Sequence, residues 1–207
     1  MTLYEILKQS PVVPVIVIHD ENDAEPLARA ILKGGINVLE ITLRTNAAFS
    51  AIQMIAERVP EVIVGAGTVL NPYQLRKARD AGAQFAVSPG LTPELLEAAR
   101  EDQFPFLPGV ASASEIMQAL QYDFTIVKPF PAEILGSTKW ITSHKSVFPH
   151  LQFFPSGGVT VDNMMHYLAL EAVVAVGGTW LTPHELIKRK DWAGITALVE
   201  ETLGLAK

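Results

Sequence analysis

A single lysine stands at the end of a segment whose residue types predict a buried strand. Apolar and β-branched residues at positions 124–127 precede Lys128, and prolines follow it at positions 129 and 131. Because proline has no N–H to give to a sheet ladder, we expect the strand to end at Lys128. In parallel α/β folds, the carboxyl ends of the strands are where catalytic groups lie.

The residues around Lys128 leave two interpretations open. A lysine at a strand end is commonly a solvated surface residue. However, Ile126 and Phe130 share its parity along an extended strand, so an inward Ile126 would also turn Lys128 inward. Burial lowers the pKa of a lysine, and the neutral amine can attack a carbonyl carbon. The alternative to a solvated lysine is therefore one that forms a Schiff base or binds an anion.

The segment at residues 38–44 alternates apolar and polar side chains. Leucine and isoleucine occupy positions 39, 41 and 43, whereas Glu40 and Arg44 lie on the other face. An exposed edge strand with a solvated polar face would have this pattern. Inside a closed barrel, which has no edge, a buried carboxylate needs a reason. Glu40 is then a candidate acid/base, and Arg44 a candidate ligand for a carboxylate or phosphate.

Hydroxyl and glycine residues mark three further predicted strand ends. Thr68 follows the segment at 65–67, where its hydroxyl could bind substrate or cap the next helix. Glycine pairs occur at 157–158 and 177–178, flanked by Ser156 and Thr179. Glycines allow backbone N–H groups to approach a phosphate, although tight turns also use them. Two pairs on the last two loops favour phosphate binding.

Composition narrows the class of protein. The chain has 207 residues, 49% of them hydrophobic, and no linker-like stretch, so we expect one domain over residues 1–207. A net charge of −6, without a basic run, argues against a nucleic-acid partner. The chain has no cysteine, which excludes disulfides and thiol catalysis and fits a cytoplasmic location.

Signals for metal binding, membranes and export are also missing. The five histidines have none of the spacings typical of metal ligands. Residues 1–10 lack the basic start and long apolar stretch of a signal peptide. The apolar run at 12–18 is too short to cross a bilayer. We therefore expect neither a bound metal nor a membrane partner.

Hydrophobic periodicity predicts eight strand and helix units after a short N-terminal helix. The expected strands are residues 12–18, 37–44, 61–67, 85–88, 104–107, 124–128, 151–154 and 173–176. The expected helices are residues 23–35, 47–59, 71–82, 92–100, 112–120, 138–147, 160–170 and 183–205. Eight such units predict a single-domain α/β fold, a (β/α)8 TIM barrel. The rival open sheet would need a dinucleotide fingerprint, but Leu70 replaces its third glycine.

The motifs at these strand ends together resemble one family. In order, they are residues 39–45, 65–70 and 88–90, Lys128 with 130–133, the pair 157–158, and residues 177–180. They resemble the 2-keto-3-deoxy-6-phosphogluconate (KDPG) and 4-hydroxy-2-oxoglutarate (KHG) aldolases over about residues 12 to 182. The resemblance implies a class I aldolase on a small barrel, a homotrimer, that binds pyruvate and a phosphorylated aldehyde and needs no metal or cofactor.

The resemblance also implies roles for individual residues. Lys128 matches the Schiff-base lysine, and Glu40 matches the general acid/base. Arg44 and Thr68 match residues that hold the substrate carboxylate. The positions that line the pyruvate pocket match Pro89 and Phe130, and the phosphate-binding positions match Ser156, Gly157, Gly158, Gly177, Gly178 and Thr179.

The chain departs from the family pattern near the lysine and in the phosphate loops. Pro129 stands where many relatives have a second aromatic residue, and residues 133–137 keep one glycine where relatives often have a pair. Ser156 replaces a common threonine and Thr179 a common serine, so a hydroxyl donor is kept at both positions. The altered loop bears on substrate stereochemistry.

The leading functional prediction is the reversible cleavage of KDPG to pyruvate and glyceraldehyde 3-phosphate. The same site could instead act on 4-hydroxy-2-oxoglutarate or on the galactonate epimer. A sugar-phosphate isomerase would use the glycine loops and an acid/base pair without an imine. A binder of phosphate ligands would have no use for an inward lysine opposite a carboxylate.

Overall fold

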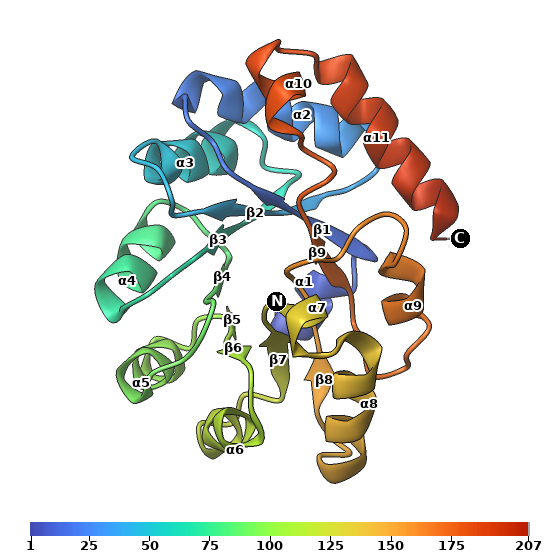
Figure 1. The fold of residues 1–207 in the computed structure, drawn as a ribbon. Coiled ribbons are helices and arrows are strands. Elements are labelled where there is room, and N and C mark those ends of the chain that lie inside the picture. Colours follow the sequence, from blue (N-terminus) through green and yellow to red (C-terminus); the bar gives the residue numbers. More distant parts are fainter. Residues whose placement is uncertain (207) are drawn as a thin grey trace.

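Short parallel strands form the centre of the protein, and helices surround them (Figure 1). The computed structural model describes residues 1–206. The strands are β1 (Val12–Ile16), β2 (Val38–Thr42), β3 (Ile63–Gly67), β4 (Phe85–Val87), β5 (Phe106–Leu107), β6 (Gly109–Val110), β7 (Ile126–Pro129), β8 (Gln152–Phe153) and β9 (Val176–Gly178).

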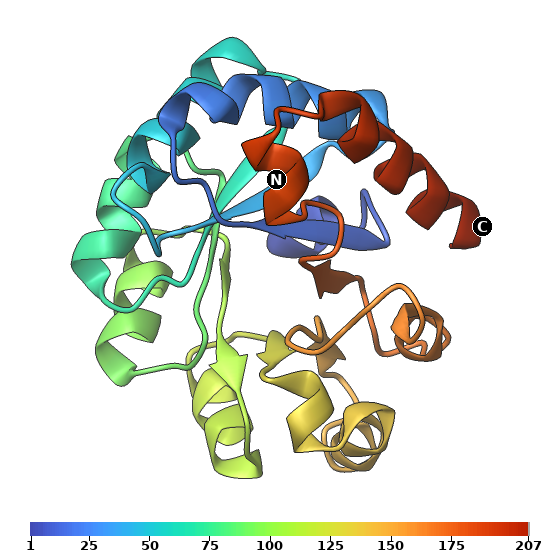
Figure 2. The same cartoon turned by 45° about the horizontal axis from the view of Figure 1, so that its top comes forward.

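The helices follow the strands in alternation, as the hydrophobic periodicity predicts, and Figure 2 shows them on the outside in a tilted view. They are α1 (Leu3–Leu7), η1 (Glu21–Asp23), α2 (Ala24–Lys33), α3 (Ala48–Arg58), α4 (Pro72–Asp80), α5 (Pro93–Glu101), α6 (Ala113–Gln121), α7 (Ala132–Leu135), α8 (Ser137–Val147), α9 (Met164–Leu168), α10 (His184–Lys188) and α11 (Trp192–Leu205). None of the helices within residues 1–206 is long and apolar enough to cross a membrane.

The strands pair in two parallel, curled sheets. One has six strands in the order β5-β4-β3-β2-β1-β9, and the other has three in the order β6-β7-β8. The predicted parallel α/β architecture is therefore confirmed, but the pairing is not that of a single eight-stranded sheet. The fifth expected strand, residues 104–107, is shortened to β5, and an additional strand, β6, follows it after Pro108, which has no N–H for the ladder. One parallel bridge joins Phe153 of β8 to Val173, which precedes β9. Another joins Ser156, which follows β8, to Gly177 of β9.

Two apolar clusters lie on opposite faces of the strands. The larger one fills the space between strands and outer helices, as in Leu39 of β2 and Ile52 of α3. The smaller one lies inside the sheets, where Ile6 and Leu7 of α1 meet inward residues of the strands, namely Val13, Val38, Ile63, Phe85, Val87, Leu107, Ile126 and Phe154. Helix α1 starts at Thr2, whose side chain forms a capping box with Glu5. The predicted short N-terminal helix is confirmed, and it closes one end of the interior.

Several elements differ from the sequence prediction. The eighth strand, expected at residues 173–176, is β9 at Val176–Gly178 and includes the glycine pair that was expected to follow it. Strand β7 does not end at Lys128 but continues through Pro129. It can do so because Lys128 and Phe130 supply the N–H groups toward β6, and Pro129 contributes only a carbonyl, which accepts from the Ser156 N–H at 3.3 Å. The short helix α7 was not predicted. The helix expected at 160–170 begins only at 164, because the Asn163 side chain holds residues 158 and 160 in a turn.

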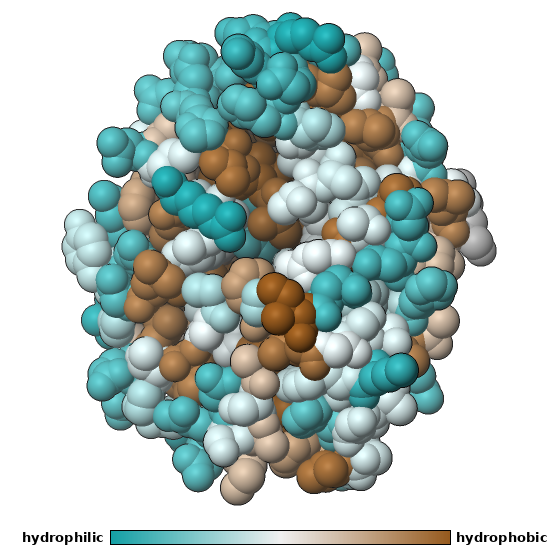
Figure 3. Space-filling view, viewed as in Figure 1, coloured by the Kyte–Doolittle hydropathy of each residue, from teal (hydrophilic) through white to brown (hydrophobic). Residues whose placement is uncertain are grey.

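The outer surface is mixed in character. On the face shown in Figure 3, hydrophobic residues form several separate groups between hydrophilic ones rather than one continuous patch. This pattern fits helices that turn their apolar sides toward the strands and their polar sides outward.

Candidate active site

Lys128 and Glu40 face each other in the interior. Lys128 comes from β7 and Glu40 from β2, in different sheets, and the Lys128 Nζ lies 3.9 Å from the Glu40 Oε1. Their side chains are only 6% and 1% exposed. The alternation along both strands turns them inward, so neither the solvated lysine nor the solvated edge strand describes them. At 3.9 Å the amine and the carboxylate are too far apart for a direct hydrogen bond, and a proton can pass between them through one water molecule or after a small approach.

Glycines on neighbouring strands make room for this pair. A Cβ added to Gly67 would overlap the Glu40 carboxylate. One added to Gly65 would overlap the ring of Phe85, and one added to Gly109 would overlap the Pro89 main chain. Gly67 therefore leaves the space that the Glu40 carboxylate occupies, whereas Gly65 and Gly109 leave space for Phe85 and Pro89.

The surroundings of Lys128 favour the neutral amine. Burial lowers the pKa of Lys128 below its usual 10.5; the Glu40 carboxylate opposes this shift, and the Arg44 guanidinium adds to it. The Nζ also lies 5.0 Å from the centre of the Phe130 ring. A larger fraction of neutral amine increases the rate of attack on a carbonyl carbon.

The second carboxylate oxygen of Glu40 is free to act on a bound molecule. Among residues 1–206, the buried Glu40 Oε2 has no hydrogen-bond partner. A buried polar atom without a partner costs free energy, so native proteins keep such atoms mainly where they have a role. Here the atom lies beside the amine and is available to a substrate hydroxyl or a water.

Arg44 and Thr68 form a second polar pair above the first. The Arg44 Nε donates a hydrogen bond to the Thr68 hydroxyl at 3.1 Å. Thr68 does not cap the following helix, because the Asn71 side chain accepts from the Gln74 N–H there. Its backbone has a φ of 59°, an uncommon value for a residue other than glycine. The strained loop turns its hydroxyl toward the guanidinium and fixes the direction of the arginine.

One cavity of about 240 Å³ joins the lysine to the glycine loops. Its lining residues are Val15, Arg44, Lys128, Phe130, Ser156, Gly157, Gly158, Val159, Gly177 and Thr179. Gly157 and Gly158 have φ values of 87° and 84°, which favour glycine and bring the main chain against the cavity. The cavity therefore has a cationic end and an end formed by glycines and hydroxyls.

Four of the residues selected from the sequence, Glu40, Thr68, Pro89 and Gly178, do not line this cavity. Glu40 lies behind Lys128, and Thr68 contacts the lining residue Arg44. Pro89 lies in a separate cavity of about 200 Å³ with Val69 and Leu91. Gly178 is buried, and its missing side chain leaves space for the ring of Trp180. The sequence also missed Val15 and Val159, because apolar residues on these elements look like ordinary core residues.

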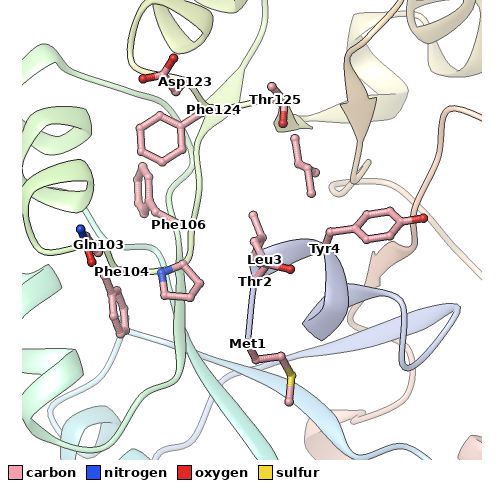
Figure 4. A pocket seen from close by; sticks show the side chains of 12 residues that line it. Met1, Thr2, Leu3, Tyr4, Gln103, Phe104, Phe106, Asp123, Phe124 and Thr125 are labelled. Atoms are coloured by element: carbon pink, nitrogen blue, oxygen red, sulfur yellow. The ribbon is translucent and has the colours of Figure 1, made fainter.

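A larger cavity of about 370 Å³ lies away from this chemistry. Figure 4 shows it beside α1, lined by side chains of residues 1–4, 103–106 and 123–126. It contains neither lysine nor glutamate nor histidine. Size alone would therefore select the larger cavity. The smaller cavity is the candidate site because it contains the buried Lys128 together with Arg44.

Comparisons with known proteins agree with this choice. The family model described as "Aldolase: KDPG and KHG aldolase" matches residues 3–198. The 2-dehydro-3-deoxy-phosphogluconate aldolase of Dickeya dadantii is 47% identical, and the match covers 96% of this chain and 93% of that protein. The KHG/KDPG aldolase of Escherichia coli is also 47% identical, and the match covers 98% of this chain and 95% of that protein.

Solved structures extend the similarity to the whole fold. A KDPG aldolase from Legionella pneumophila, with pyruvate captured as a covalent carbinolamine, has a TM-score of 0.95 and 42% identity over 98% of both chains. A Zymomonas mobilis KDPG aldolase with 3-phosphoglycerate has a TM-score of 0.92 and 43% identity over 97% of this chain and 94% of that one. By the family model and these relatives, the chain belongs to the KDPG and KHG aldolase family.

Proposed function

We propose that the protein is a class I aldolase that reversibly cleaves KDPG to pyruvate and glyceraldehyde 3-phosphate. The observation that carries this proposal is the buried Lys128 Nζ, 3.9 Å from the Glu40 carboxylate and in one cavity with the glycine loops. The relatives named as KDPG aldolases support the reaction, and the carbinolamine of the Legionella enzyme supports its covalent chemistry.

The reaction begins at the lysine. Neutral Lys128 attacks the C2 ketone to form a carbinolamine, which loses water to give an iminium. Glu40, directly or through a water, takes the proton of the C4 hydroxyl. The C3–C4 bond breaks, the aldehyde leaves, and the bonding electrons pass to the iminium to form an enamine. Glu40 returns a proton to C3, and hydrolysis of the new iminium releases pyruvate and restores the amine.

The remaining residues hold the two ends of the substrate. Arg44, fixed by Thr68, binds the carboxylate, and Phe130 lines the site of the pyruvate half. The phosphate binds at Ser156, Gly157, Gly158, Gly177 and Thr179, where main-chain N–H groups and hydroxyls serve as donors. The resemblance also assigns Pro89 to the pyruvate pocket and Gly178 to the phosphate site, but neither residue lines the cavity. The net charge of −6 repels an anionic substrate, so these local groups must hold it.

The proposal includes a closed (β/α)8 barrel formed by one domain. The succession of β5 and β6 around Pro108 and the bridges between the chain around β8 and β9 support closure, since together they join the two sheets at both margins. The family resemblance supports a homotrimer, which sedimentation would test, and a monomer would remove it. A cytoplasmic location remains a prediction from the sequence.

Trapping of the imine tests the proposed function. Pyruvate and borohydride are added to the protein, and peptide masses then locate any reduced adduct. An adduct on Lys128 is the expected result, and a folded protein without one would refute the class I mechanism. Comparing turnover of KDPG, its galactonate epimer and 4-hydroxy-2-oxoglutarate then identifies the preferred substrate.

A further inference from the structure

The chain that follows Lys128 lies directly against the first glycine loop. The Ala132 N–H donates to the Ser156 carbonyl at 2.8 Å, and the Glu133 N–H donates to the Gly157 carbonyl at 3.2 Å. Helix α7 is thus bonded through its first two residues to the loop that lines the glycine end of the cavity. The lysine end and the glycine end of the site are connected through this contact.

The two segments approach as closely as their main chains allow. A Cβ on Gly158 would lie 2.7 Å from the side chain of Glu133. A Cβ on Gly157 would lie 2.9 Å from the Pro131 Cα and 3.0 Å from the Phe130 ring. These distances leave no room for a Cβ at either position, so a shift of Glu133 toward the loop would displace the two glycines.

Helix α9 holds this contact from the outside. The Tyr167 hydroxyl donates a hydrogen bond to the Glu133 Oε1, across 34 positions of sequence. Tyr167 is fully buried in the apolar cluster, whereas Glu133 is an exposed residue of α7. Asn163, the N-cap residue of α9, donates a hydrogen bond from its side chain to the Gly158 carbonyl at 3.1 Å. Helix α9 therefore contacts the glycine loop through Asn163 and contacts Glu133, which packs on that loop, through Tyr167.

The tyrosine keeps its proton over the working range of pH. Burial raises the pKa of Tyr167 to about 12, and the hydrogen bond to Glu133 adds to this effect. A phenol held in this form donates steadily to a carboxylate, and hydrogen bonds to charged groups are stronger than neutral ones. The bond is thus a permanent link between α9 and α7.

We propose that Tyr167 and Glu133 are a positioning pair that sets the affinity of the site for the phosphate end of the substrate. The pair acts through Gly157 and Gly158 and leaves the chemistry at Lys128 unchanged. This inference depends on the proposed aldolase function. A phenylalanine at position 167 would fill the same volume, and an exposed carboxylate adds little to the core. The hydroxyl and the carboxylate therefore serve the hydrogen bond that positions α7 against the glycine loop, and they are not needed to fill the core.

The test compares variants that remove or keep the hydrogen bond. Tyr167→Phe and Glu133→Ala remove it, Glu133→Gln keeps an acceptor oxygen, and Tyr73→Phe is a matched control. Tyr73 is 71% exposed, and its hydroxyl makes no hydrogen bond to residues 1–206. For each variant, kcat and KM are measured with KDPG and with its dephosphorylated analogue, together with the rate of pyruvate trapping at Lys128.

The expected result is selective. Tyr167→Phe and Glu133→Ala raise KM for KDPG at least about 10-fold, the lower end of the loss expected for one hydrogen bond to a charged group. Their kcat, their KM for the dephosphorylated analogue and their trapping rate stay within about twofold of wild type. Glu133→Gln restores most of the KDPG affinity, and Tyr73→Phe changes nothing.

Other outcomes overturn the inference. Equal losses on both substrates, or a lower melting temperature with unchanged KM, would assign the pair a purely structural role. Should Tyr167→Phe fail to fold, Glu133→Ala at the exposed position still gives the answer. If wild-type protein forms no adduct with pyruvate, the aldolase proposal fails together with the pair. An adduct combined with unchanged KM in both variants refutes the pair alone.

Discussion

Replacing Gly67 with alanine should disable Glu40 without touching Lys128. The Gly67 backbone is not in the left-handed region, so alanine is allowed there. The new methyl group would overlap the Glu40 carboxylate and also lie 2.6 Å from the Glu40 Cγ. The carboxylate must therefore move while the strand stays in place. Gly67 is thus a site where the cost in stability and the cost in activity can be separated.

The Gly67→Ala substitution should cost little stability but much activity. Overpacking costs about 1–3 kcal/mol, and the loss of a glycine from the unfolded chain returns about 0.4–1 kcal/mol. A net loss of about 1 kcal/mol lowers the melting temperature by roughly 2–4 °C in a chain of this size. A displaced general acid/base costs about 10²- to 10⁴-fold in rate.

The assay measures melting temperature, kcat on KDPG and borohydride trapping of pyruvate for Gly67→Ala. Gly204→Ala is the control, because a Cβ there meets no atom of residues 1–206 within 4 Å. We expect kcat to fall at least about 100-fold in Gly67→Ala, with trapping at Lys128 retained. A variant with kcat within about threefold of wild type would refute the placement of Glu40 against β3.

Three further predictions follow from the same site. Lys128→Ala should abolish both turnover and the pyruvate adduct; near-normal activity would refute the mechanism. Arg44→Ala should raise KM more than it lowers kcat, because the arginine binds the carboxylate in ground and transition states alike, and the reverse pattern in steady-state kinetics would contradict its role. Because burial lowers the pKa of Lys128, the folded chain binds fewer protons than the unfolded chain between that lowered pKa and the usual 10.5. Stability should therefore rise with pH through this window, as measured by urea unfolding, and Lys128→Met should remove this rise; an equal rise in the variant would assign it to other groups.

The sequence predicted the elements that periodicity governs. Alternation along β2 and β7 placed Glu40 and Lys128 on one face each, but left open whether that face is exposed or buried; the structure buries both. The pair at 157–158 follows β8 as expected, whereas the pair at 177–178 lies within β9. Proline was misleading, because a strand can pass through it where neighbouring residues supply the N–H groups, as at Pro129.

Contacts between distant segments could not be predicted from local patterns. Thr68 had two possible partners in the sequence, and only the position of Asn71 at the helix start leaves it for Arg44. Glu133 and Tyr167 lie on helices of four and five residues, too short for a periodic signal. Their hydrogen bond depends on how closely α7 and α9 pack, and no local sequence pattern predicts that distance.

The placement of α1 has a consequence for how the chain reaches its folded state. Ile6 and Leu7 precede every strand in the sequence, yet they pack against residues as late as Phe154 and Ala175. Helix α1 therefore has no complete binding surface until nearly the whole chain has left the ribosome. A five-residue helix is not stable alone in water. It must dock as a late step of assembly, and that step joins the first residues of the chain to strands from both sheets.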